Sequence, residues 1–83
     1  MIKTALHLTD VQRALDIARI NKQRVDVSFW KKSTGDIVHL KGWLVTGSHW
    51  RGGTHRFFNP ESGQLREVRD INIFNFNGHE VYV

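Results

Sequence analysis

The residues best able to carry chemistry lie in one segment, residues 38–59, where basic side chains and tryptophans occur together without acids. No Asp or Glu occurs between Asp36 and Glu61, and two of the three tryptophans, Trp43 and Trp50, fall inside. Lys and Arg neutralise phosphates, and aromatic rings stack on unpaired bases. The segment therefore favours a surface that binds nucleic acid without catalysis. Its basic and titratable side chains are Lys41, Arg51, Arg56, His39, His49 and His55.

The alternation of a β-strand decides which of these side chains share a face, because neighbouring residues point to opposite sides. A strand from residue 37 to about residue 50 places Val38, Leu40 and Leu44 on the inner side. The outward side then carries His39, Lys41, Trp43, His49 and Arg51, and the next strand adds Arg56. We predict that RNA or single-stranded DNA binds at Lys41, Trp43, His49, Arg51 and Arg56.

Two other interpretations of these residues stay open. In the first, Trp43 and Trp50 belong to the core, because a small domain needs its large apolar side chains inside, and the cations form an ordinary solvated surface. In the second, the chain is a protein–protein interaction or assembly module with no affinity for nucleic acid. Such a module would use sheet edges, the helix, or exposed aromatics such as Trp30 and Tyr82.

The histidines raise the question of a metal site, since imidazole is a common ligand of zinc and related ions. If residues 51–53 form a three-residue turn, His49 faces His55, which gives two ligands and no carboxylate nearby in the sequence. The chain has no cysteine, which excludes disulfides and thiolate ligands. We predict neither a metal nor a cofactor.

Catalysis would need a nucleophile beside a base, or paired acids. Ser48 and His49 are adjacent, as are His79 and Glu80, and adjacent residues of a strand point to opposite faces. The pair Gly52-Gly53 lacks the strand, loop and helix context of a phosphate-binding loop. We therefore predict that the protein is not an enzyme.

Length and composition describe a single small domain. With 83 residues, 40% of them hydrophobic and 24% charged, the chain is long enough for one globular core. Its formal net charge of +4 permits an anionic partner without requiring one. No apolar run approaches the roughly 20 residues that span a bilayer, so we expect a cytoplasmic protein that does not enter a membrane.

A single helix is expected near the N-terminus, over about residues 10–22. Thr9 and Gln12 have the spacing of a capping box, in which each side chain bonds to the backbone of the other residue. The helical period then places apolar residues on one stripe, which should pack against the sheet. The members of this stripe are Val11, Ala14, Leu15 and Ala18.

From residue 24 the apolar period changes to two, which predicts strands separated by turns. The pair Asn77-Gly78 is the strongest hairpin signal of the chain, because both residues accept positive φ. Gly42 and Gly47 interrupt the longest strand, and a bulge at either of them would reverse the alternation beyond it. The expected strands cover residues 24–30, 37–50, 54–59, 64–76 and 79–83.

One capped helix followed by five short antiparallel strands, the second bent at Gly42 and Gly47, resembles an Sm-like or SH3-like small β-barrel. The resemblance implies a mainly β fold, in which an N-terminal α-helix precedes a strongly bent, five-stranded antiparallel barrel over residues 24–83. It also implies homo-oligomers formed through strand edges. The chain has no RNA-binding loop motif of the Sm group, so the resemblance implies no functional residue.

Overall fold

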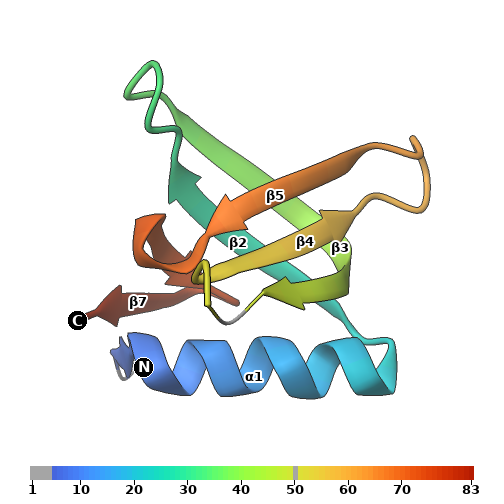
Figure 1. The fold of residues 1–83 in the computed structure, drawn as a ribbon, viewed down its shortest axis with the longest axis horizontal. Coiled ribbons are helices and arrows are strands. Elements are labelled where there is room, and N and C mark those ends of the chain that lie inside the picture. Colours follow the sequence, from blue (N-terminus) through green and yellow to red (C-terminus); the bar gives the residue numbers. More distant parts are fainter. Residues whose placement is uncertain (1–4, 50) are drawn as a thin grey trace.

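A helix and seven strands make up the fold, which is mainly β as the sequence predicted (Figure 1). The computed structural model describes residues 5–49 and 51–83. Five strands were expected; the two additional ones arise because a short N-terminal strand precedes the helix and because a 3₁₀ turn divides residues 64–76. The elements are β1 (Leu6–His7), α1 (Leu8–Asn21), β2 (Arg24–Trp30), β3 (Ile37–His49), β4 (Thr54–Phe58), β5 (Leu65–Arg69), η1 (Asp70–Asn72), β6 (Ile73–Phe76) and β7 (His79–Tyr82).

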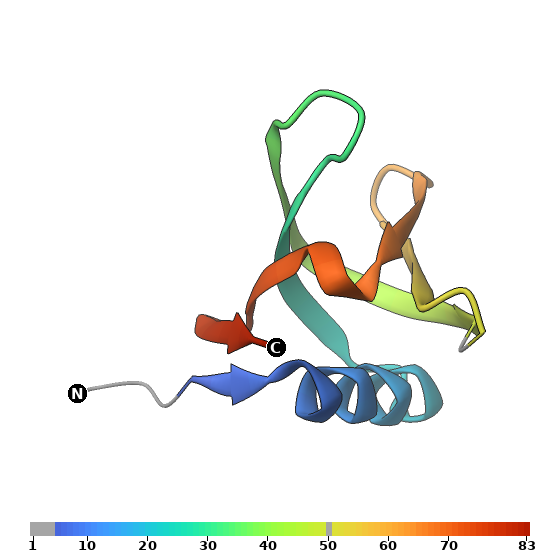
Figure 2. The same ribbon diagram turned by 60° about the vertical axis from the view of Figure 1, so that its left-hand side comes forward.

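The strands form one sheet in the order β1-β7-β6-β2-β3-β4-β5. The short pairing of β1 with β7 is parallel, and the other pairings are antiparallel. In the described part of the chain β1 and β5 are the two edges and do not pair, so the sheet is not closed. The sheet bends strongly above α1, which runs along its open side (Figures 1 and 2).

The helix begins two residues earlier than expected, and the predicted capping box does not form. His7 is the N-cap, and its Nδ1 accepts a hydrogen bond from the Thr9 backbone N–H at 3.1 Å. Thr9 therefore lies inside the first turn, and the Gln12 side chain bonds elsewhere. At the other end Lys22 adopts a left-handed conformation with φ of 55°, and its N–H bonds to the Ala18 carbonyl. Such a residue ends a helix by satisfying its last carbonyl groups.

The apolar stripe of the helix packs against the sheet as predicted. Val11, Leu15 and Ala18 are buried, whereas Ile17 and Ile20 are 55% and 69% exposed. The stripe meets the inward residues of five strands and forms one continuous core with them. The buried apolar residues are Val11, Leu15, Ala18, Val25, Val27, Phe29, Leu40, Trp43, Val45, Phe57, Val68, Ile73 and Phe76.

A bulge at Gly42 makes the outward assignment of Trp43 wrong. The register between β2 and β3 shifts between the pairs Val25–Trp43 and Val27–Leu40. Gly42 has φ of 71°, and its N–H donates to Asp26 Oδ1 at 2.7 Å. The extra residue reverses the alternation beyond it. Trp43, only 7% exposed, therefore points into the core on the same side as Leu40.

A second register shift restores the predicted face at the end of β3. It lies between Val45 and Gly47, where β3 pairs with β4. Beyond it His49 lies opposite Thr54, and both are on the outer side of the sheet. Two reversals cancel, so the alternation predicts the face of His49 correctly although it fails for Trp43. Trp50, whose face the sequence left open, lies outside the described residues.

Candidate functional site

The structure separates the five residues that were predicted to bind nucleic acid. Trp43 is in the core, and Lys41 is exposed before the bulge. Lys41 lies eight residues from His49 along β3, a distance of up to about 26 Å in an extended strand. His49, Arg51 and Arg56 are exposed around the β3–β4 hairpin. The predicted site is therefore a hairpin cluster of His49, Arg51 and Arg56, with Lys41 at a separate position.

His49 and Arg56 line a shallow hollow of about 220 Å³ on the outer face of β3, β4 and β5. Glu67 of β5 lies directly across from Arg56, and the Arg56 Nη2 to Glu67 Oε2 distance is 3.8 Å. Residues 38–59 contain no acid in the sequence, but in the folded molecule the neighbouring strand β5 places the Glu67 carboxylate beside them. Both side chains of this ion pair are more than half exposed. Such pairs contribute at most about 1 kcal/mol to stability and remain available to a stronger anion.

The His49 ring is held by the turn that follows it. Its Nδ1 accepts a hydrogen bond from the Gly52 N–H at 3.2 Å. A Cβ atom at residue 52 would lie 2.6 Å from the same nitrogen, so only glycine fits without displacing the ring. The role of Gly52 is therefore to let the turn approach His49 closely.

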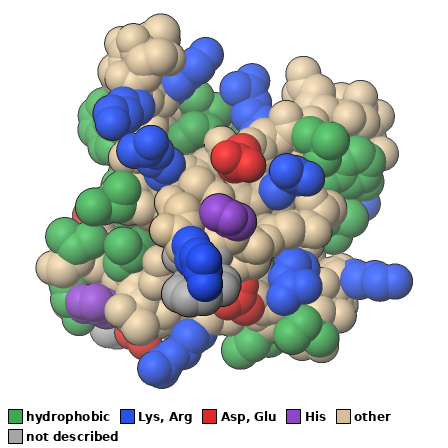
Figure 3. All heavy atoms as spheres, viewed as in Figure 1, with side chains coloured by type: hydrophobic (Ala, Val, Ile, Leu, Met, Phe, Trp, Pro, Cys, Tyr) green, Lys and Arg blue, Asp and Glu red, His purple; other side chains and the backbone are tan. Residues whose placement is uncertain are grey.

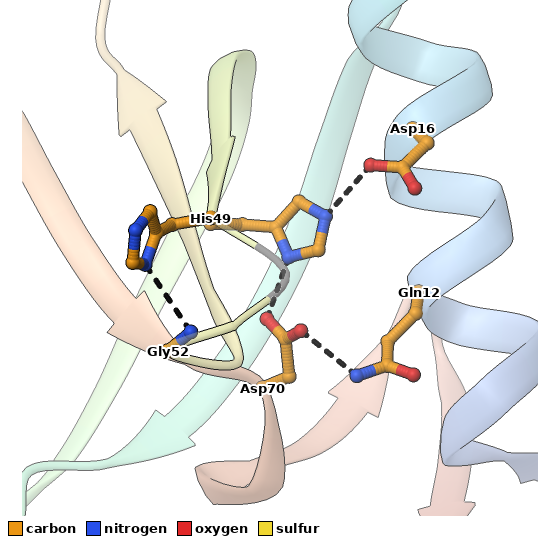
Figure 4. A network of polar contacts seen from close by, with 6 residues as sticks. Gln12, Asp16, His49, Gly52 and Asp70 are labelled. Carbon is orange, nitrogen blue, oxygen red and sulfur yellow. Dashed lines mark hydrogen bonds and ion pairs between the residues drawn. The ribbon is translucent and has the colours of Figure 1, made fainter.

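A polar cluster, formed by Gln12, Asp16, His55 and Asp70, joins the helix to the sheet. Figure 4 labels three of its members, Gln12, Asp16 and Asp70. His55 and Asp70 are only 4% and 3% exposed. His55 Nδ1 is 2.6 Å from Asp70 Oδ1, and His55 Nε2 is 2.9 Å from Asp16 Oδ1. Gln12 Nε2 donates to the second oxygen of Asp70 at 3.0 Å. We call these four residues the histidine cluster.

Three elements position the histidine cluster. Gln12 and Asp16 are four residues apart on α1, so they project from one side of the helix, beside the apolar stripe. His55 points inward from β4, two residues from the fully buried Phe57. The backbone N–H of Asp70 donates to the Gly53 carbonyl at 2.8 Å, which fixes the start of η1 against the β3–β4 turn.

Both ring nitrogens of His55 face carboxylates, which determines its charge. An ionised carboxylate only accepts hydrogen bonds, so two ionised partners favour the imidazolium form of the ring, in which both nitrogens donate. Burial by itself lowers the pKa of His55, but the hydrogen bonds and negative charges of Asp70 and Asp16 outweigh it and raise the pKa above 6.5. The cluster thus holds a positive charge between two negative ones.

The chemistry open to the histidine cluster follows from this arrangement. Both ring nitrogens of His55 are engaged by carboxylates, so neither faces a site where a substrate could bind. The described members of the cluster are an amide, two carboxylates and an imidazolium, none of which is paired with a hydroxyl nucleophile. The geometry therefore fits a clamp that joins α1 to β4 and η1.

Protein stability should depend on pH through His55. Its pKa is raised on folding, so its contribution is complete below pH 6.5, the unfolded value, and is lost as the pH rises through the folded pKa. Each unit by which folding raises the pKa contributes about 1.4 kcal/mol. Urea unfolding of the unmodified chain across this pH range should show the decline, and Asp16→Asn, which removes one of the two carboxylates that raise the pKa of His55, should make it smaller. A free energy of unfolding that rises with pH in this range, and rises less steeply in Asp16→Asn, would contradict the charged state.

The two histidines considered for a metal site do not face each other. Ser48 lies opposite His55, and His49 lies opposite Thr54, because four residues separate His49 from Thr54 in the chain. Within residues 5–49 and 51–83, no three His, Asp or Glu side chains are placed so that they could hold a metal ion. The same part of the chain has no helix of the length and apolarity that crossing a membrane requires.

Fold and site together describe a small, mainly β protein in which a buried histidine, placed between a buried and a half-exposed aspartate, joins a helix to an open, seven-stranded sheet. No protein-family model matches the chain, and comparisons with curated proteins and with solved structures give no significant match.

Proposed function

We propose that the protein is a non-catalytic, nucleic-acid-binding domain that uses the side of the molecule formed by residues 31–69. One observation carries the proposal. This range contains seven of the twelve Lys and Arg but only three of the eight Asp and Glu, so it carries the whole formal net charge of +4. All seven cations are exposed; they are Lys31, Lys32, Lys41, Arg51, Arg56, Arg66 and Arg69.

The rest of the chain has as many acids as cations, and two of its acids are occupied by the histidine cluster. The charge of the molecule is therefore uneven, and the positive side attracts a polyanion. Figure 3 shows Lys and Arg side chains spread over the face that carries β4 and β5. Lys41, His49, Arg51 and Arg56 remain part of the proposed surface, and Trp43 does not.

The small β-barrel architecture belongs to this proposal as well. Two features support it: a long strand bent at a glycine with positive φ, Gly42, and a 3₁₀ turn, η1, ahead of the last hairpin. In this architecture the bent strands curl around one core, and their outer surfaces and loops are left for ligands. We place the proposed nucleic-acid surface on those outer strands and loops.

Titration of labelled RNA and DNA at several salt concentrations tests the proposed function. The logarithm of the binding constant should fall with the logarithm of the salt concentration, by about 0.7–0.9 for each phosphate that the protein neutralises. Fluorescence anisotropy measures both quantities. Binding that is weak and indifferent to salt would refute the proposal.

A triple variant, Lys41→Ala/Arg51→Ala/Arg56→Ala, should weaken binding and lower the salt slope by about 1 for each phosphate that is no longer neutralised. Its stability should change little, because these side chains are exposed. The matched control removes three exposed cations of the helix and its C-cap, as Arg13→Ala/Arg19→Ala/Lys22→Asn, since asparagine accepts the left-handed conformation of residue 22. If both triple variants lose affinity equally, only total charge matters and the surface assignment is wrong.

Assembly through sheet edges is the second candidate function. It is favoured by the open edge of β5, which pairs with β4 alone in the described part of the chain. Leu65, at the start of that edge, is 62% exposed. Unpaired backbone groups on an edge can accept another strand. A sedimentation measurement decides: a defined oligomer without affinity for RNA or DNA would favour assembly over nucleic-acid binding.

A further inference from the structure

The end of β2 presents an aromatic ring to solvent, which the core residue Trp43 cannot do. Trp30 is 48% exposed, and Ile37, opposite it on β3, is 46% exposed. The Trp30 and Phe74 ring centroids are 5.4 Å apart, with the planes tilted by 42°. Phe74 supports the indole from one side, so its position is fixed while part of the ring remains accessible.

Two lysines follow Trp30 directly, and the turn that carries them is well defined. The Lys31 N–H donates to the Asp36 carbonyl at 2.8 Å, and the Lys31 carbonyl accepts from the Gly35 N–H at 2.7 Å. Gly35 has φ of 76°, which closes the turn at a conformation that suits glycine. Lys31 and Lys32 are both exposed, so their ammonium groups project from a fixed base beside the indole.

A hollow of about 280 Å³ lies between this turn and the strand β5 with the η1 turn that follows. Its charged lining residues are Lys31, Lys32, Arg69 and Glu67, so cations exceed acids by two. Glu67 also pairs with Arg56, which reduces its repulsion of an anion.

We infer that the end of β2 and this hollow form the part of the surface that selects an unpaired nucleic-acid strand. The base stacks on Trp30, and Lys31, Lys32 and Arg69 contact the phosphates on either side of it. Stacking on an aromatic side chain requires a base whose face is free, which duplexes do not offer. The inference rests on the proposed function and adds the class of strand to it.

An extended acidic peptide is the other ligand that the charges would accept. The exposed indole favours the nucleic acid, since each base has a flat π face and each linkage a phosphate, whereas an acidic side chain offers no ring to stack. Typical small-molecule sites have volumes of about 300–1,000 Å³. The hollow is slightly smaller, which suits a short segment of a nucleic-acid strand lying along it.

The test compares labelled 12-nucleotide single strands with the corresponding duplexes, using the full chain and its variants. Trp30→Ala should weaken single-strand binding about 5- to 150-fold, the range typical of removing a stacking residue. Trp30→Phe should retain most of the affinity. Tyr82→Ala, which removes a similarly exposed aromatic on β7, should have little effect. Quenching of tryptophan fluorescence by a single strand should be smaller in Trp30→Phe, in which Trp43 and Trp50 remain.

The outcomes distinguish a failure of the single-strand site at Trp30 from a failure of nucleic-acid binding as a whole. If single strands and duplexes bind equally and Trp30→Ala has no effect, the inference is overturned while nucleic-acid binding stands. If no nucleic acid binds but a poly-glutamate peptide does, both are overturned in favour of an acidic protein partner. If Trp30→Ala lowers thermal stability, a loss of affinity in that variant does not identify a stacking role, and Trp30→Phe replaces it as the test. Unchanged fluorescence quenching by a single strand in Trp30→Phe would overturn the inference.

Discussion

Replacing His55 with Ala should lower the free energy of unfolding by about 3–5 kcal/mol, the cost of breaking a buried charged pair from one side. The substitution leaves Asp70, 3% exposed, with a hydrogen bond from Gln12 but without the positive charge of the imidazolium beside it. A domain of this size often has only about 3–5 kcal/mol of stability. We therefore expect His55→Ala to be largely unfolded at 25 °C.

Urea unfolding followed by circular dichroism measures this effect, and two further variants test its cause. Asp16→Asn should cost much less, because the Asp16 side chain is 47% exposed and water can replace its contact. The double variant His55→Ala/Asp70→Ala should be more stable than His55→Ala alone, since it leaves no unpaired charge at these two buried positions. A double variant less stable than the single one would show that reduced packing, not charge, dominates.

Replacing Trp43 with Ala should also be strongly destabilising, by about 3–5 kcal/mol, as for other large core aromatics. The bulge at Gly42 points this indole into the core, where it is 7% exposed. The cavity left by the substitution cannot collapse fully, because neighbours such as Leu40 and Val45 are fixed in the sheet. Thermal and urea unfolding give the measurement.

Trp30→Ala is the matched control for Trp43→Ala, since the same side chain is removed from an exposed position. Its stability should change by less than about 1 kcal/mol. The two substitutions should therefore have different effects: Trp43→Ala should lower the stability of the fold, and Trp30→Ala should lower the affinity for nucleic acid. If Trp43→Ala folded normally and lost only nucleic-acid binding, the outward assignment made from the sequence would be right after all.

The parts of the fold that the sequence predicted depend on neighbouring residues. The helix stripe of Val11, Leu15 and Ala18 follows from a period of 3.6 residues, and all three are buried. The hairpin at Asn77-Gly78 forms with φ of 50° and 85°, and it pairs Phe76 with His79 as predicted. Both features are decided within a few residues, so local patterns are sufficient to find them.

The parts that it missed depend on partners far along the chain. Gly42 is a natural site for a bulge, but the bulge itself is fixed by Asp26, sixteen residues earlier. The extra residue at this bulge changes the face of the residues that follow, which is why the alternation misplaces Trp43. The strand β1 was also missed, because two residues carry no period and pair only with β7.

The histidine cluster was missed for the same reason, although part of its signal is local. Gln12 and Asp16 stand four apart beside the apolar stripe, and His55 alternates with the core residue Phe57. These positions indicate polar side chains that point inward, but they do not predict which residues those side chains contact. Asp70 lies fifteen residues from His55, in a segment whose sequence is simply polar.

The contacts of His55 have a consequence for how the molecule folds and opens. They join segments that are separated by 39 and 15 positions in the chain, so they cannot form until the helix, the β4 strand and the η1 turn have all come together. Contacts over such separations slow folding, because loop closure must precede them. Detachment of α1 alone would break the contacts of Asp16 with His55 and of Gln12 with Asp70. We therefore expect helix and sheet to unfold together.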